Sequence, residues 1–433
     1  MPDPKFLQIH TLTSYPATLL NRDDAGFAKR LPFGGATRTR VSSQCLKYHW
    51  RNFDGENALY GMDVPRSLRS RETFLRRVGQ PLMDDGIPSP LAYAATASLK
   101  ALILGESNHI DSSGYLKKSS FKDFISAGFE EDTDALRSGQ VTILGVPEVR
   151  HLRQIARHEV QGLREDFDNL VRDGEVPEDV REEAYSRFRE YYKSSSDIGK
   201  NLRGLEQASG LDAAMFGRMA TSDVLARGDA AVHVAHAFTT HEQEAESDYF
   251  SAVDELRRDD PQESGEMGAG HINSQELTSG LFYGYVTIDV PLLVSNLSGV
   301  ERENWTDGNT DLAAAVVRRF VKLIATVSPG AKLGSTAPHS YANCVFVESG
   351  SAQPRTLANA FQSPVDERDV LANSYDALAR YVDDMDGMYG VQTDRRLAAM
   401  GPTDRLTDRI EGVDEPVPVP DVAEWTANQI QTA

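Results

Sequence analysis

A basic segment near the start of the chain carries side chains of the kind that bind phosphate. It reads FGGATRTRVSSQCLKYHWR, residues 33–51, and has no Asp or Glu, although the whole chain of 433 residues has a formal net charge of −20. Its cations are Arg38, Arg40, Lys47 and Arg51. Positive side chains at this density suit a chain of phosphates, which they would position without regard to base sequence.

The first half of the segment also has backbone features that suit an anion. Gly34 and Gly35 permit positive φ or a close backbone approach. Arg38 and Arg40, two residues apart in an extended run, are expected to point the same way. Ser42 or Ser43 is a good N-cap, and the first turn of the helix that begins there offers unpaired N–H groups to an anion.

The second half of the segment predicts an amphipathic helix. On a helical wheel, Lys47 and Arg51 lie on the same side as Gln44. The apolar residues lie on the opposite side; they are Leu46, Trp50 and Phe53. The sequence therefore predicts one face for the core and one for phosphates. The alternative is an ordinary solvated helix face preceded by a turn.

Carboxylates and histidines elsewhere could do other chemistry. Asp23 and Asp24 could hold Mg²⁺ beside a phosphate or transfer protons, but we favour a turn or an ion pair with Arg22. His233, His236 and His241, followed by Glu242, do not match the H-E-x-x-H spacing of a helical metal site. In a strand the first two of these would face opposite sides. We therefore predict histidines packed in the core or in a groove, and no metal.

Two apolar groups in polar surroundings could contact bases. Met219 lies in GRMATS, residues 217–222, where core packing is the usual role and a base contact is the alternative. Tyr249, Phe250 and Val253 are the apolar residues of an acidic excursion after residue 241. They could pack on the main body or form a wedge between bases. A second basic patch, residues 65–77, is a solvated face or a secondary contact to a nucleic-acid backbone.

The elements that must position these residues alternate between strand and helix patterns. Strands are predicted at residues 5–15, 230–240, 276–290 and 342–349, and helices at 42–53 and 310–327. Two insertions interrupt them, a mostly helical one at 56–210 and the acidic one at 241–275. Without the insertions the order is β-α-β-β-α-β, which predicts an α+β, ferredoxin-like fold of the RNA-recognition-motif type.

Composition bounds the remaining possibilities. The acidic pI of about 5.0 argues against a chain that coats nucleic acid indiscriminately, but it permits a local basic groove. The two cysteines, Cys45 and Cys344, are far apart, so neither a disulfide framework nor a cysteine metal site is expected. The N-terminus lacks the layout of a secretory signal and no apolar run could span a membrane, so we expect a cytoplasmic protein.

Several motifs in a fixed order resemble one family. They are NRDDAGFAKR, FGG, RTRVSSQCLK, GRMATS, VAHAFTTH, DYFSAVDEL, QELTSGLFY and PGAK. Together they are similar to the CasC backbone subunits of the type I-E CRISPR Cascade surveillance complex, which belong to the RAMP superfamily. The resemblance covers most of the chain outside residues 55–210.

The resemblance implies a hand-shaped protein without catalytic role, metal or cofactor. Its palm would comprise residues 1–55, 211–240 and 276–433, the last with C-terminal helices, its fingers 56–210 and its thumb 241–275. Copies would line up along a crRNA, and each thumb would kink the guide and flip one nucleotide, leaving the rest free to pair with target DNA. The other partners implied are the large and small Cascade subunits and those at the 5′ and 3′ ends of the guide.

The resemblance also assigns residues. Those expected to hold the crRNA are Arg22, Lys29, Gly34, Gly35, Arg38, Arg40, Ser42, Ser43, Gln44, Lys47, Arg51 and Lys332. Met219 would lie against bases, and Tyr249, Phe250 and Val253 would form the thumb wedge. Lys117 and Lys118 are candidates for target-DNA contacts. Tyr48 departs from the pattern, because family members can have a basic residue there.

Two other functions stay open at this point. Backbone subunits of type III effectors cut target RNA with an aspartate in a loop comparable to the one that holds Asp23 and Asp24, and this would require Mg²⁺. The chain could also be a stand-alone RNA-binding protein.

Overall fold

The computed structural model describes residues 6–131, 133–168, 176–191, 202, 210–218, 228–253 and 269–431. The chain divides into two compact units. The first unit comprises Met1–Met62, His233–Val290 and Thr310–Ala433, and the second comprises Asp63–Val232 and Pro291–Asn309. Within the described residues, no helix combines the length and apolarity that crossing a membrane requires.

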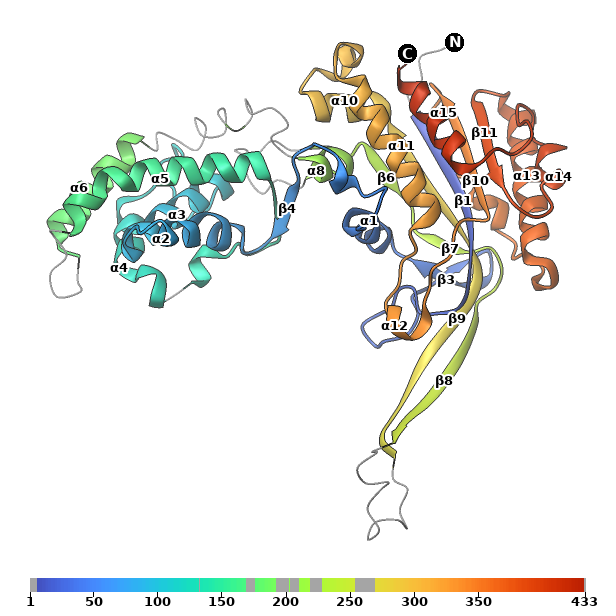
Figure 1. Ribbon diagram of the computed structural model, residues 1–433, viewed down its shortest axis with the longest axis horizontal. Coiled ribbons are helices and arrows are strands. Elements are labelled where there is room, and N and C mark those ends of the chain that lie inside the picture. Colours follow the sequence, from blue (N-terminus) through green and yellow to red (C-terminus); the bar gives the residue numbers. More distant parts are fainter. Residues whose placement is uncertain are drawn as a thin grey trace, which may run out of the picture. The chain divides into compact units, whose positions relative to one another are not determined.

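The first unit is built on an antiparallel sheet (Figure 1). The strand order is β11-β10-β1-β9-β7-β3-β2, and β6 and β8 also pair with β9. The strands are β1 (Phe6–Thr18), β2 (Arg30–Phe33), β3 (Ala36–Val41), β6 (Val232–Val234), β7 (Ala237–Thr239), β8 (Glu244–Val253), β9 (Ala269–Asp289), β10 (Cys344–Gly350) and β11 (Asp394–Ala399). The strands predicted from sequence are found in β1, β9 and β10, and the one predicted at 230–240 is divided into β6 and β7. The prediction of an α+β fold is confirmed.

Helices cover one face of this sheet through aromatic and aliphatic contacts. The helices of the unit are α1 (Ser43–Asn52), α11 (Thr310–Thr326), α12 (Leu333–Thr336), α13 (Val370–Tyr389), α14 (Asp404–Thr407) and α15 (Val419–Gln431), with shorter turns η1 (Leu59–Gly61), η5 (Ala358–Phe361) and η6 (Glu367–Asp369). Tyr15 and Phe282 of the sheet pack against Leu46 of α1. Trp50 of α1 meets Phe320 of α11 edge to face, with ring centroids 5.4 Å apart.

The opposite face of the sheet is covered as well. Tyr283 follows Phe282 on β9, so the two side chains point to opposite faces. Tyr283 packs in a cluster with Phe346 of β10 and with Tyr375 and Leu378 of α13. Both faces of the central strands are therefore buried under helices of the same unit.

One strand extends beyond the sheet. The second half of β9 pairs with β1, from Thr18↔Thr278 to Phe6↔Asp289. Its first half pairs with β8, from Val253↔Ala269 to Glu244↔Ser279. We call β8 with residues 269–279 the β8–β9 ribbon, which runs out from the sheet as a two-stranded arm (Figure 1).

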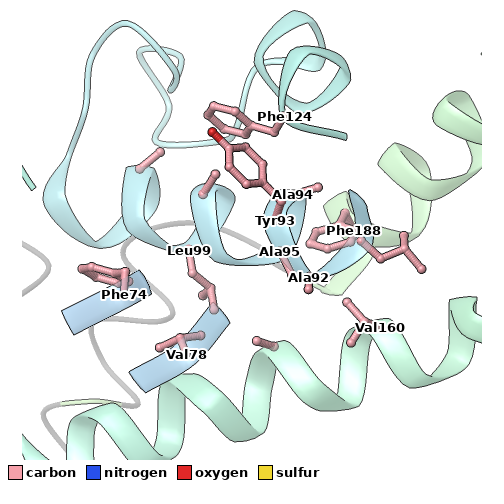
Figure 2. Packing of buried hydrophobic residues seen from close by; sticks show 14 of the residues in the cluster. Phe74, Val78, Ala92, Tyr93, Ala94, Ala95, Leu99, Phe124, Val160 and Phe188 are labelled. Carbon is pink, nitrogen blue, oxygen red and sulfur yellow. The ribbon is translucent and has the colours of Figure 1, made fainter. Parts of the chain in front are cut away.

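The second unit is mostly helical. Its elements are β4 (Ser67–Ser70), η2 (Leu75–Gly79), α2 (Gln80–Asp84), α3 (Ser89–Leu104), α4 (Lys118–Glu131), η3 (Asp134–Leu136), β5 (Thr142–Gly145), α5 (Val146–Asp168), α6 (Glu178–Tyr191), α8 (Leu211–Phe216), α10 (Val290–Ser298) and η4 (Arg302–Asp307). Residues 91–104 of α3 are all buried, and the one charged residue among them, Lys100, forms an ion pair with Glu106. Phe74, Val160 and Phe188 surround α3 in this core (Figure 2).

Candidate nucleic-acid interface

The β2–β3 hairpin presents the double glycine of the basic segment. Phe33 pairs with Ala36, and the two residues between them, Gly34 and Gly35, have φ of 64° and 81°. Two successive residues with positive φ are typical of a tight hairpin turn and favour glycine at both positions. The predicted positive φ is confirmed. The close approach made by Gly34 is to the backbone of Gln362 in its own chain.

Arg38 requires a correction to the predicted phosphate ligands. Its side chain is completely buried. The guanidinium donates to the carbonyl oxygens of Thr239 (2.9 Å), His241 (3.2 Å) and Phe361 (2.9 Å). Burial lowers the pKa of Arg38, and the negative charge of Glu242 acts in the other direction. Arg38 therefore clamps β3 to β7, to the segment that enters the ribbon and to η5, and it has no surface left for a phosphate.

Arg40 lies half-buried on the same strand and meets a histidine. Its Nε donates to the carbonyl oxygen of Arg30 (3.1 Å), and its Nη1 lies 3.0 Å from Nδ1 of His236. Burial lowers the pKa of His236, and the charges of Arg40 and Lys29 lower it further. A neutral imidazole can accept the guanidinium N–H, so His236 can support Arg40. The prediction of packed histidines is wrong for His233 and His236, because both are exposed.

Helix α1 begins as the sequence predicts. Ser42 is the N-cap, and its Oγ accepts from the backbone N–H of Cys45 at 3.3 Å. The backbone N–H of Ser42 in turn donates to Oδ1 of Asn21 (3.0 Å). Both Ser42 and Ser43 are buried. The cap thus ties the start of α1 to the loop that precedes β2.

The two predicted faces of α1 are present. Trp50 is buried, whereas Gln44 and Tyr48 are exposed. Lys47 and Arg51 are half-buried between these extremes. The exposed side of the helix is therefore the one that carries the amide, the phenol and the two cations.

A groove opens where the β8–β9 ribbon leaves the sheet. Its volume is about 720 Å³. It brings together two predicted residues from distant parts of the chain, Arg22 and Lys332. Arg30 and Phe27 also line it; neither was predicted from the sequence, although both belong to the motif NRDDAGFAKR.

A buried carboxylate organises one wall of this groove. Glu276 of β9 has an exposed fraction of 8%. Its Oε2 accepts from the backbone N–H of Ala28 at 2.8 Å, and its Oε1 forms an ion pair with Arg30. The neighbouring Gln275 accepts from Nζ of Lys332 at 2.8 Å. The start of β9 thus fixes both the loop before β2 and the start of α12.

Asp23 holds a turn. Its Oδ1 accepts from the backbone N–H groups of Ala25 (3.0 Å) and Phe27 (2.9 Å). The backbone N–H of Asp23 donates to the carbonyl oxygen of Phe27 (2.8 Å). Asp24 is exposed. These contacts fit the turn interpretation that we preferred for the pair.

Among the described residues, His241 is the histidine that lies in a cluster with two carboxylates. Its ligand atoms and those of Glu244 and Glu367 lie within 4.8 Å of one another. However, Nε2 accepts from the backbone N–H of Leu281 (3.2 Å), so Nδ1 carries the proton and donates to the carbonyl oxygen of Glu242 (2.7 Å). Neither nitrogen has a lone pair to offer a metal. Burial is the main cause that lowers the pKa of His241.

The remaining predicted residues lie elsewhere. Met219 is outside the described residues. Tyr249 and Phe250 occupy β8 positions opposite Ser274 and Asn273, and Val253 is the last residue of β8, but the side chains of all three are outside the described part of the chain.

Lys117 and Lys118, the candidates for target-DNA contacts, already have partners inside the second unit. Nζ of Lys117 donates to the carbonyl oxygens of Ser107 (3.0 Å) and Asn108 (3.1 Å). Nζ of Lys118 lies 2.6 Å from a carboxylate oxygen of Glu182. Both lysines therefore make structural contacts within this unit.

Comparisons with known proteins identify the fold and a family. A family model described as "CT1975-like protein" matches residues 7–425. A chain of a solved structure titled "CRISPR RNA-guided surveillance complex, pre-nicking" matches with a TM-score of 0.69 and 24% identity, over 98% of this chain and 100% of that one. A chain of another, titled "CRISPR RNA-guided surveillance complex", has a TM-score of 0.62 and 20% identity, over 98% and 99%. The comparison with curated proteins finds no match.

Proposed function

We propose that the first unit of this chain holds a crRNA. The premise is that the chain belongs to the CT1975-like protein family, the CasC backbone subunits of the type I-E Cascade surveillance complex. The guide would follow what we call the guide-binding surface: the β2–β3 hairpin, the exposed side of α1 and the groove at the base of the β8–β9 ribbon. One observation carries this proposal. Arg22 and Arg30 of the segment before β3 and the distant Lys332 line one groove in a chain whose net charge is −20.

The covered sheet supports this location. In many RNA-recognition folds, bases stack on an open sheet face. Here helices bury both faces of the central strands. Hairpin, helix and loop are therefore the parts of the first unit that an RNA backbone would contact, and backbone contacts give affinity without sequence preference.

The remaining assignments follow from family membership. The first unit would be the palm, the second unit the fingers and the β8–β9 ribbon the thumb that kinks the guide. Copies would form a filament with the other Cascade subunits in the cytoplasm and present the crRNA for base pairing with target DNA. In such a complex base pairing selects the target, and the protein reads backbone and shape.

We infer that the subunit is not catalytic. The carboxylate of Asp23 is used by two backbone N–H groups of its own turn, which supports a structural role. A type III-like ribonuclease would show Mg²⁺-dependent, regularly spaced cuts in a target RNA bound to the assembled complex, lost in Asp23→Ala or Asp24→Ala. The absence of such cuts is the expected result.

Co-expression with a CRISPR array and the other Cascade subunits tests the main proposal. The wild-type chain should co-purify with a discrete crRNA in a large complex, and Lys47→Ala with Arg51→Ala should lose both. The matched control is Arg405→Ala with Arg409→Ala, which removes two cations at the same spacing near α13, on the opposite face of the sheet. Normal crRNA yield from the α1 variant would contradict the proposal, and a monomer that retains RNA would indicate a stand-alone RNA-binding protein.

A further inference from the structure

An aromatic ring lies exposed in the groove. Phe27 has an exposed fraction of 54% and lines the groove at the base of the β8–β9 ribbon. Exposing a phenylalanine to water is unfavourable, and a single exposed apolar residue is by itself ordinary. Its position among cations is what makes this ring informative.

The loop holds Phe27 in place from both sides. On one side, Asp23 accepts from the backbone N–H of Phe27 and donates to its carbonyl oxygen. On the other side, the backbone N–H of Ala28 donates to the buried carboxylate of Glu276. Arg22 and Ala28 are also bridged across the loop. The backbone that carries the ring is thus fixed before any ligand arrives, which reduces the entropy lost on binding.

The charges around the ring select the ligand. Among the described residues, the guanidinium of Arg22 has no carboxylate within ion-pair distance, and Lys332 lies against the ribbon amide of Gln275. The groove also contains Glu246 and Glu276, but Glu276 is already paired with Arg30. A flat apolar ring in a groove that also holds Arg22 and Lys332 suits a ligand that has a planar face and anionic linkages. A nucleotide of single-stranded RNA has both.

We propose that Phe27 is a stacking platform for one nucleobase of the bound guide. This inference rests on the proposed function. Stacking of this kind tolerates any base, because every base has a π-face. It is therefore compatible with guides of any sequence, and it gives Asp23 and Glu276 a role as positioning residues for the ring.

The test compares two RNAs and three substitutions on the full-length chain. The probes are a fluorescent single-stranded RNA and an abasic sugar–phosphate strand of the same length. Phe27→Ala should weaken binding of the RNA by about 5- to 150-fold, the range for loss of one base–aromatic stack. Phe27→Trp should retain the affinity. Phe27→Leu, which keeps an apolar side chain without a π-face, should lose most of it.

The abasic strand separates stacking from other roles of the ring. Wild type should bind the abasic strand more weakly than RNA, and Phe27→Ala should bind the abasic strand as well as wild type does. If Phe27→Leu binds RNA as tightly as wild type, or if Phe27→Ala weakens both probes equally, the stacking role is wrong and contact with a protein partner or a folding effect is indicated. Thermal unfolding of each variant measures the folding effect.

Two different results distinguish a failure of the stacking inference from a failure of the proposed function. If wild type binds RNA, Lys47→Ala with Arg51→Ala weakens binding, and Phe27→Ala does not, only the stacking inference fails. If wild type binds neither probe and carries no crRNA from co-expression, the proposed function fails with it.

Discussion

Gly34 lies so close to the carbonyl oxygen of Gln362 that a Cβ atom at position 34 would be 1.4 Å from that oxygen. A Cβ atom at Gly35 would meet nothing within 4 Å. Both residues have positive φ, so both carry the same backbone requirement. The two adjacent glycines thus differ in one respect, the contact of Gly34 with the segment after η5.

This pair makes a matched experiment. We expect Gly35→Ala to lower the free energy of unfolding by about 1–2 kcal/mol, the strain of a left-handed residue with a Cβ atom. Gly34→Ala should lower it by about 1–3 kcal/mol more, because the backbone of Gln362 must move. Urea unfolding of the two variants measures the difference. Equal urea midpoints would show that the hairpin can move away from η5 without any loss of stability.

Arg38 should affect stability and leave RNA binding unchanged. Arg38→Lys keeps the charge but cannot donate to three separated carbonyl groups, so we expect a loss of about 3 kcal/mol from unsatisfied buried acceptors. The folded protein should keep the wild-type slope of log affinity against log salt. Lys47→Ala is the opposite case, with near-wild-type stability and a slope that is shallower by about 0.7. Arg38→Gln removes the charge and should also keep the wild-type slope; a shallower slope for that variant would restore Arg38 as a phosphate ligand.

His241 should make the first unit less stable in mild acid. Burial holds its pKa below the usual 6.5, and Nε2 is the acceptor for Leu281. The unfolded chain therefore binds more protons than the folded one as pH falls below about 6.5, and stability is lost in that range and fully present above it. His241→Gln keeps an acceptor that does not titrate.

Urea midpoints at pH 5.5 and 7.5 check this prediction. The difference between the two midpoints should be smaller in His241→Gln than in wild type. It should not vanish, because the pKa values of His151 and His236 are also lowered by burial. An unchanged difference would mean that His241 does not contribute to the acid sensitivity.

Tyr48 marks a place where this chain could bind RNA more tightly. Its ring is 60% exposed beside Lys47 on α1. If α1 binds RNA as proposed, Tyr48→Arg should raise the affinity for single-stranded RNA. It should also steepen the slope of log affinity against log salt by about 0.7, the value for one added phosphate contact. Met388→Arg, on a side chain that is 74% exposed near the end of α13, adds the same charge elsewhere and should change neither. Equal effects of both variants would indicate general charge attraction.

The fold was largely predictable where burial follows a simple period. Strands β1, β7, β9 and β10 and helices α1 and α11 have apolar residues at strand or helix spacing. Strand β11 was missed because its sequence, DRRLAA, looks polar. Arg395 in it is nevertheless buried, and its guanidinium bonds to Glu348 and Asp386, whose positions a single sequence does not reveal.

The same limit explains the errors in the candidate site. The cap at Ser42 and the faces of α1 are local, so sequence spacing predicts them. Arg38 and Arg40 have the same local pattern, yet only Arg38 is fully buried, since its acceptors come from residues 239, 241 and 361. Phe27 was overlooked for the same reason, because its groove exists only once the start of β9 and Lys332 are folded beside it.

Strand β9 leaves little room for insertions or deletions. It runs without interruption from Ala269 in the ribbon to Asp289 in the sheet. One residue gained or lost near its middle would turn every later side chain to the other face, exchanging those of Phe282 and Tyr283 between two different cores. The length of β9 is therefore constrained by packing on both sides of the sheet, and variation in the reach of the arm among relatives should be confined to the segment between β8 and β9.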